Sequence, residues 1–113
     1  MQFFGSRNSI ILFTVVTALI HLGLGVAFFS DVLGKLFLLN AIGYLVLMYA
    51  LLWKPGFLQG QASLVRWAYI VYTIVTIVAF FVVQGANAFT SVPGLVTKLD
   101  ELLLTYSLFR YSA

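Results

Sequence analysis

Four long apolar stretches, separated by short polar breaks, run along the chain. They cover about residues 9–29, 33–53, 65–84 and 92–111. A helix that rises ~1.5 Å per residue needs about 20 residues to cross a hydrocarbon core of ~30 Å, and these stretches have about that length. The pattern therefore predicts four membrane-spanning helices in a single transmembrane domain, residues 1–113.

The breaks between the stretches predict how the helices connect. The first break, residues 30–34, is so short that the helices on either side of it must be antiparallel neighbours. A Lys-Pro-Gly sequence at residues 54–56 ends the second stretch, because proline cannot continue a helix and glycine terminates one readily. Residues 85–94 are rich in turn formers, and Pro93 suits the start of a helix. We expect an all-α, antiparallel, up-down-up-down four-helix bundle.

The fourth stretch is the most polar one. Lys98, Asp100 and Glu101 fall in its first half, and its uninterrupted apolar run covers only residues 102–109. Apolar side chains nevertheless recur at helical spacing along the stretch, at Leu95, Leu99, Leu102, Tyr106 and Phe109. We therefore expect this helix to span the membrane rather than lie along its surface, with Asp100 facing the lipid headgroups.

The composition agrees with a lipid environment. Of the 113 residues, 63% are hydrophobic and only 8% are charged, whereas soluble domains carry about 25% charged residues. The net charge of +3 comes from single basic residues at the ends of apolar stretches, so it does not predict nucleic-acid binding. The chain contains no cysteine, which excludes disulfides and thiolate metal sites. This composition predicts an integral membrane protein.

The basic residues also predict an orientation in the cell membrane. One predicted side carries Arg7, Lys54, Arg66 and Arg110, and the other carries Lys35, Lys98 and all three acids. Because cytoplasmic loops are enriched in lysine and arginine, both termini are expected in the cytoplasm. Trp53 and Trp67 flank the loop on the same side, where amphipathic rings prefer to lie. The apolar run after Arg7 is too long for a cleaved signal peptide, so we expect it to be retained.

Polar side chains gather in the outer half of the predicted bundle, and the inner half is expected to be almost purely apolar. His21 is the single histidine, and Asn40 lies at a similar depth on the second helix. Helical spacing places His21 on one face with Thr14, Thr17 and Gly25. The candidate binding residues of this outer pocket are His21, Asn40, Tyr44, Thr76, Gln84, Lys98 and Glu101.

Several of these residues allow more than one interpretation. His21 can form a structural hydrogen bond, contact a substrate, or serve as one axial ligand of a haem or chlorophyll-type pigment. Lys98 and Glu101 can form an ion pair at the lipid surface, or Glu101 can meet His21 or Asn40 inside the bundle. Asn40 can simply join two helices by hydrogen bonds.

The sequence carries no nucleotide loop, no catalytic triad spacing and no metal-ligand cluster, so we do not expect an enzyme. One remaining function is a non-enzymatic accessory or scaffold subunit of a larger membrane complex, of respiratory or photosynthetic type. Its partners would then be the lipid bilayer and other membrane subunits or a second copy of the chain. The alternative is a small transporter, or a ligand- or cofactor-binding membrane protein, that uses the outer pocket around His21 and Glu101.

Three short motifs carry a resemblance. They are the His-Leu-Gly-Leu-Gly pattern at residues 21–25, the run 37–47, and the segment 94–104 with its Lys98 and Glu101. In these places the chain resembles small uncharacterised four-helix membrane proteins of archaea and bacteria, which implies the same fold and no known activity. Small multidrug transporters are similar in size and number of spans, but they rely on a glutamate in the first helix.

Overall fold

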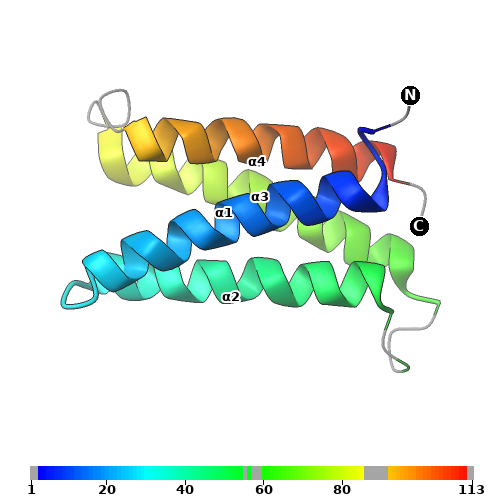
Figure 1. Cartoon of the computed structure of the whole chain (residues 1–113), viewed down its shortest axis with the longest axis horizontal. Coiled ribbons are helices and arrows are strands. Elements are labelled where there is room, and N and C mark those ends of the chain that lie inside the picture. Colours follow the sequence, from blue (N-terminus) through cyan, green and yellow to red (C-terminus); the bar gives the residue numbers. More distant parts are fainter. Residues whose placement is uncertain (1–2, 55, 57–59, 86–91, 112–113) are drawn as a thin grey trace.

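The computed structural model describes residues 3–54, 56, 60–85 and 92–111. Four α-helices account for most of them: α1 (Arg7–Ala27), α2 (Val32–Leu52), α3 (Ala62–Gln84) and α4 (Val92–Arg110). Successive helices run in alternate directions, and the start of α1 lies beside the end of α4 (Figure 1). The four predicted helices are thus confirmed, packed into a body of 40 × 30 × 20 Å.

The helix ends differ from the predicted ones by a few residues, for local reasons. The chain enters α1 through Ser6, whose side-chain oxygen accepts a hydrogen bond from the backbone N–H of Ser9 at 3.1 Å. This cap starts α1 two positions before the predicted start. In α3, the N–H of Val65 donates to the carbonyl of Gln61 at 2.9 Å, so the helix includes a turn that was expected to be loop. The turn was predicted at residues 85–94; residues 86–91 of it lie outside the described residues, and α4 begins at Val92.

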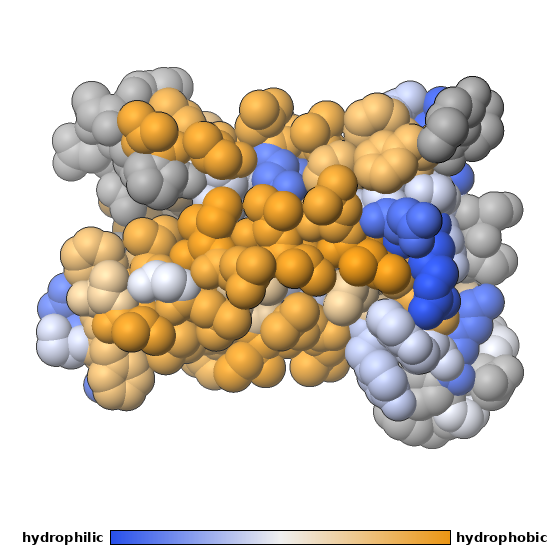
Figure 2. Space-filling model, in the orientation of Figure 1, coloured by the Kyte–Doolittle hydropathy of each residue, from blue (hydrophilic) through white to orange (hydrophobic). Residues whose placement is uncertain are grey.

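Three of the helices have the length and apolar character of membrane spans. Within the described part of the chain these are Arg7–Ala27, Gly34–Leu52 and Ala62–Val83. The visible face of the molecule is mainly apolar, with hydrophilic side chains gathered at its two ends and one small hydrophilic patch between them (Figure 2). The chain is therefore a small helical membrane protein, and its three candidate spans suggest that it crosses the bilayer more than once.

Helix α4 combines an apolar outer face with a polar inner face. Leu99, Leu102 and Phe109 are 60%, 56% and 54% exposed, so much of the stripe recognised in the sequence faces outward. The expectation that Asp100 faces the headgroups is wrong, because this side chain is only 8% exposed. Since Asp100 directly precedes the buried Glu101, the rotation of α4 turns both acids inward.

The hydrophobic core is concentrated toward the end of the bundle where the chain begins. It is built from all four helices, by Ile10, Phe13, Tyr44, Leu51, Leu52, Val65, Tyr69, Ile70, Leu104 and Leu108. The expectation of an almost purely apolar inner half is wrong, because Thr14 is hydrogen-bonded to Tyr69 inside this core. Ser9, Thr73 and Ser107 are buried as well. The bond between Thr14 and Tyr69 cross-links α1 to α3, which lipid does not drive together.

Two arginines satisfy backbone groups at helix ends. Arg7 donates to the carbonyl of Leu52 in α2 at 3.0 Å, and Arg66 donates to the carbonyl of Leu108 in α4 at 3.0 Å. The last carbonyls of a helix have no intrahelical donor, and a positive charge near them is favourable. Because each arginine comes from a neighbouring helix, these contacts fasten α1 to α2 and α3 to α4 at the same end of the bundle.

Candidate functional site

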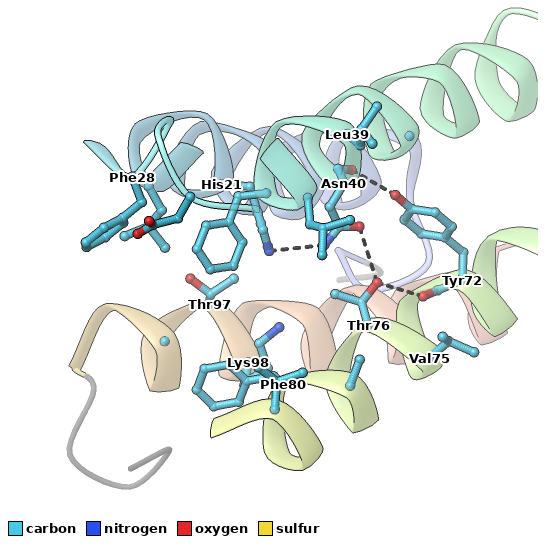
Figure 3. A pocket seen from close by; sticks show the side chains of 18 residues that line it. His21, Phe28, Leu39, Asn40, Tyr72, Val75, Thr76, Phe80, Thr97 and Lys98 are labelled. Atoms are coloured by element: carbon cyan, nitrogen blue, oxygen red, sulfur yellow. Dashed lines mark hydrogen bonds between the residues drawn. The ribbon is translucent and has the colours of Figure 1, made fainter. Parts of the chain in front are cut away.

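His21 faces the interior from the second half of α1. It is 4% exposed and lies on the same face as the buried Thr17 and Gly25, as the helical spacing predicts. Its Nδ1 lies 2.8 Å from the carbonyl oxygen of Thr17, and the side-chain Nδ2 of Asn40 lies 3.2 Å from its Nε2 (Figure 3). A neutral ring with its proton on Nδ1 satisfies both contacts, since Nδ1 then donates and Nε2 accepts.

Asn40 connects α2 to both α1 and α3. Its side-chain oxygen accepts a hydrogen bond from Thr76 at 3.4 Å, and its backbone carbonyl accepts one from the hydroxyl of Tyr72 at 2.9 Å. Together with the contact to His21, these bonds place one amide at the junction of three helices (Figure 3). This arrangement fixes the positions of α1, α2 and α3 relative to one another along the bundle axis.

A second polar cluster surrounds Glu101, whose side chain is fully buried. Its Oε2 accepts hydrogen bonds from the hydroxyl of Tyr44 at 2.7 Å and from that of Thr17 at 3.0 Å. Its Oε1 forms an ion pair with Lys98, whose side chain is 6% exposed. The carboxylate is therefore held by α1, α2 and its own helix α4.

Neither predicted arrangement of Glu101 is correct as it stands. The ion pair with Lys98 is formed, but it is buried instead of lying at the lipid surface. The hydrogen bonds of Glu101 go to Thr17 and Tyr44 rather than to His21 or Asn40. Thr17 lies between the two clusters, because its hydroxyl is also 3.2 Å from Nδ1 of His21.

The ion pair is an unusual feature in such an apolar chain. Burying a charge in a medium of low dielectric is costly unless an opposite charge and hydrogen bonds surround it. Glu101 has both, and the Lys98 ammonium also lies 5.1 Å from the centre of the Phe80 ring, within the range of a cation–π contact. The pair is therefore electrically neutral, and the carboxylate is held by two hydrogen bonds as well as by the ammonium.

A cavity of about 800 Å³ lies beside these clusters. His21, Asn40, Thr76, Thr97 and Lys98 form its polar wall. In the close view, His21 and Asn40 lie on one side of the space and Lys98 and Phe80 on the other (Figure 3). Ligand pockets in proteins commonly have volumes of about 300–1,000 Å³, so this space is large enough for a small molecule.

The rest of the cavity wall is apolar and includes several aromatic rings. Phe28, Phe37, Tyr72 and Phe80 all line it. Leu39 of α2 and Val75 and Val83 of α3 also line the cavity while being 64%, 59% and 64% exposed. Side chains that border the cavity and the outer surface together form a rim, so the cavity opens sideways between α2 and α3.

The structure brings most of the predicted site residues together. His21, Asn40, Thr76 and Lys98 line the cavity, whereas Tyr44 and Glu101 form the hydrogen-bonded cluster that holds Lys98. The side chain of Gln84 lies outside the described residues.

The predicted candidate residues include none of the four aromatic members of the wall, Phe28, Phe37, Tyr72 and Phe80. Tyr72 precedes Thr76 by one helical turn, so the spacing rule applied to the other residues of α3 would have found it. Phe37 precedes Asn40 by three residues and Tyr44 by seven, so the same rule would have placed it on their face of α2.

The metal chemistry of the site is limited by its composition. Within the described ranges, no group of three or more histidine, cysteine or acidic side chains is placed to hold a metal ion. A hydrogen bond from Nδ1 of a histidine to a carbonyl is common in metal-binding imidazoles, and His21 has it. Axial ligation of a haem or chlorophyll-type pigment by Nε2 would require this nitrogen to lose its contact with Asn40.

The fold and the site together define a small helical membrane protein with an internal polar network beside a laterally open apolar cavity. Searches against models of protein families, curated proteins and solved structures found no match. The resemblance carried by residues 21–25, 37–47 and 94–104 therefore stays a prediction.

Proposed function

We propose that the protein is a non-enzymatic, ligand-binding membrane protein that takes a small amphipathic molecule from the bilayer into the cavity between α2 and α3. The observation that carries the proposal is the combination of a polar wall, formed by His21, Asn40 and Lys98, with an apolar rim that opens sideways. A molecule with a polar head and an apolar body matches both parts.

The energetics of the site support a binding role. Polar and charged groups inside a membrane protein are costly, and they are commonly retained where they bind or transport something. An empty apolar cavity also loses the dispersion contacts that a filled one would have. The hydrogen bonds of Glu101 to Tyr44 and Thr17 favour a fixed binding wall over a catalytic group that must exchange protons.

We also propose four spans with both termini in the cytoplasm. Arg7 and Arg66 lie at one end of the bundle, near Trp53 and Trp67, and this is the end where the chain begins and α4 finishes. Basic and aromatic residues together are typical of a cytoplasmic membrane boundary. The outward-facing apolar stripe of α4 supports a spanning position for this helix.

An accessory or scaffold role in a larger respiratory or photosynthetic complex is the alternative. Exposed apolar side chains, such as Leu19, Val46 and Val82, would contact a partner subunit or a second copy of the chain. Lipid covers the same surface equally well, so this surface favours neither function. The cavity, by contrast, is required for ligand binding and is not required for a scaffold, and this difference favours binding.

Filling the cavity tests the proposal. Ala79 lines the cavity, whereas Ala68 is exposed on the same helix away from it, so Ala79→Trp and Ala68→Trp form a matched pair. Native mass spectrometry of protein purified in mild detergent from its own membrane should show a bound small molecule on the unaltered chain and on Ala68→Trp, but not on Ala79→Trp. Equal adducts on the two variants, or no adduct on any of the three proteins, would count against a binding function.

A further inference from the structure

The polar wall of the cavity offers hydrogen-bond donors that have no partner in the described part of the chain. Asn40 Nδ2 carries two N–H groups and uses one of them for His21. Lys98 Nζ carries three, and its one described acceptor is Glu101 Oε1. Of the acceptor atoms nearby, Asn40 Oδ1 already accepts one hydrogen bond from Thr76, so the free N–H groups outnumber its remaining acceptor capacity. The wall therefore fits a ligand that accepts hydrogen bonds.

The charges around the cavity favour a neutral ligand. The positive charge of Lys98 is balanced by Glu101, and the remaining charged group that lines the cavity within the described ranges is Asp31. An anion would meet a wall with no uncompensated positive charge and with Asp31 nearby. A cation would be attracted by the exposed Asp31, but at the polar wall it would meet the N–H groups of Asn40 and the ammonium of Lys98, which repel it. A neutral acceptor avoids both costs.

The shape of the apolar wall favours a planar ring. Four aromatic side chains, Phe28, Phe37, Tyr72 and Phe80, border the same space as the donors. Aromatic side chains pack against a flat π-system in stacked or edge-to-face geometry. The lateral opening between α2 and α3, bordered by Leu39 and Val83, then leaves a path for an apolar tail into the bilayer.

These features together identify a chemical class. We propose that the cavity binds a quinone, a planar ring with neutral carbonyl acceptors, and that its hydrocarbon tail leaves between α2 and α3. The carbonyl oxygens accept hydrogen bonds from Asn40 Nδ2 and Lys98 Nζ, and the ring packs among the aromatic side chains. This inference rests on the proposed binding function and goes beyond it by naming the head group.

Four probes with alkyl tails of nine or ten carbons test the head group on the unaltered protein. They are decylubiquinone, decylbenzene, decanoate and decyltrimethylammonium, each titrated into the detergent-solubilised chain and followed by native mass spectrometry. We expect decylubiquinone to form a one-to-one complex at least about tenfold tighter than the other three, as expected for one or two additional hydrogen bonds.

The outcomes separate this inference from the proposed function. If decanoate or decyltrimethylammonium binds as tightly as decylubiquinone, the quinone class is wrong but an amphipathic ligand site stands. If decylbenzene binds equally well, the polar wall does not recognise a head group and the inference is again wrong. If none of the four binds, both the inference and the binding function are wrong.

Variants place the probe in the cavity. Asn40→Ala should weaken binding of decylubiquinone about threefold to tenfold and leave decylbenzene unchanged, because only the quinone uses the amide. Ala79→Trp should abolish binding of decylubiquinone, whereas Ala68→Trp should preserve it. Unweakened quinone binding to Asn40→Ala or to Ala79→Trp would overturn this placement. The comparison among probes uses the unaltered chain, so it decides the head group even if Asn40→Ala folds poorly.

Discussion

Glu101 shows how a charged side chain is accommodated inside this bundle. Its two oxygens contact Thr17, Tyr44 and Lys98, so no single neighbour accounts for its position. Sequence spacing identifies Lys98 and Glu101 as a pair, because they are one helical turn apart. The hydroxyl groups come from α1 and α2, and their contribution depends on how those helices are rotated against α4.

Removing one member of the ion pair should be more harmful than removing both. Lys98→Met leaves the fully buried Glu101 without its counter-charge, and we expect the free energy of unfolding to fall by about 3 kcal/mol. The double variant Lys98→Met with Glu101→Leu should be more stable than Lys98→Met alone. Unfolding in sodium dodecyl sulfate, followed by the helical circular dichroism signal, measures these differences. A double variant less stable than Lys98→Met would show that the pair stabilises the fold in its own right.

The packing between helices depends on where glycine allows close approach. Gly34 lies in the first turn of α2, in close contact with the end of α1. A Cβ built on it would collide with the carbonyl group of Phe28. Gly23 lies on the exposed side of α1, and a Cβ there would meet nothing within 4 Å. Gly25, two residues further along α1, packs against α2 near Leu38.

Gly34 and Gly23 give a matched pair of substitutions. Gly34→Ala should lower the free energy of unfolding by about 1–3 kcal/mol, since the backbone must shift to avoid the clash. Gly23→Ala should leave it unchanged or raise it by up to about 1 kcal/mol, because alanine favours a helix over glycine. The detergent unfolding experiment described for Lys98 compares them. Equal effects of the two substitutions would be inconsistent with the tight turn between α1 and α2.

The proposed orientation predicts which ends of the bundle are accessible from outside the cell. The chain contains no cysteine, so single cysteines can be introduced without a background. Ser30 in the α1–α2 turn and Gln61 before α3 are both exposed. In intact cells, a membrane-impermeant maleimide should label Ser30→Cys, whereas Gln61→Cys should react only after the membrane is permeabilised.

A cysteine added after Ala113 tests whether α4 spans. It should behave like Gln61→Cys if both termini are cytoplasmic. Labelling of this added cysteine in intact cells, with Gln61→Cys still protected, would place α4 at the outer surface. Labelling of Gln61→Cys with protection of Ser30→Cys would instead reverse the orientation of the whole bundle.

The number and extent of the helices could be predicted from the sequence, because apolar length and turn formers act locally. The inward face of α1 was also predictable, since His21, Thr17 and Gly25 are related by helical spacing. Even the shared depth of His21 and Asn40 followed from counting residues, and these side chains do contact each other at 3.2 Å. Each of these features depends on a single helix, or on how far two residues lie from the shared end of their two helices.

Only the tertiary structure decided the contacts that depend on how the helices rotate and separate. The rotation of α4 buries Asp100 and turns Glu101 toward Thr17 and Tyr44 instead of His21. The separation of α2 and α3 creates the cavity, which no single helix encodes. A helical pattern specifies which side chains share a face, but the partner of that face is a property of the packed bundle, because it depends on all four helices at once.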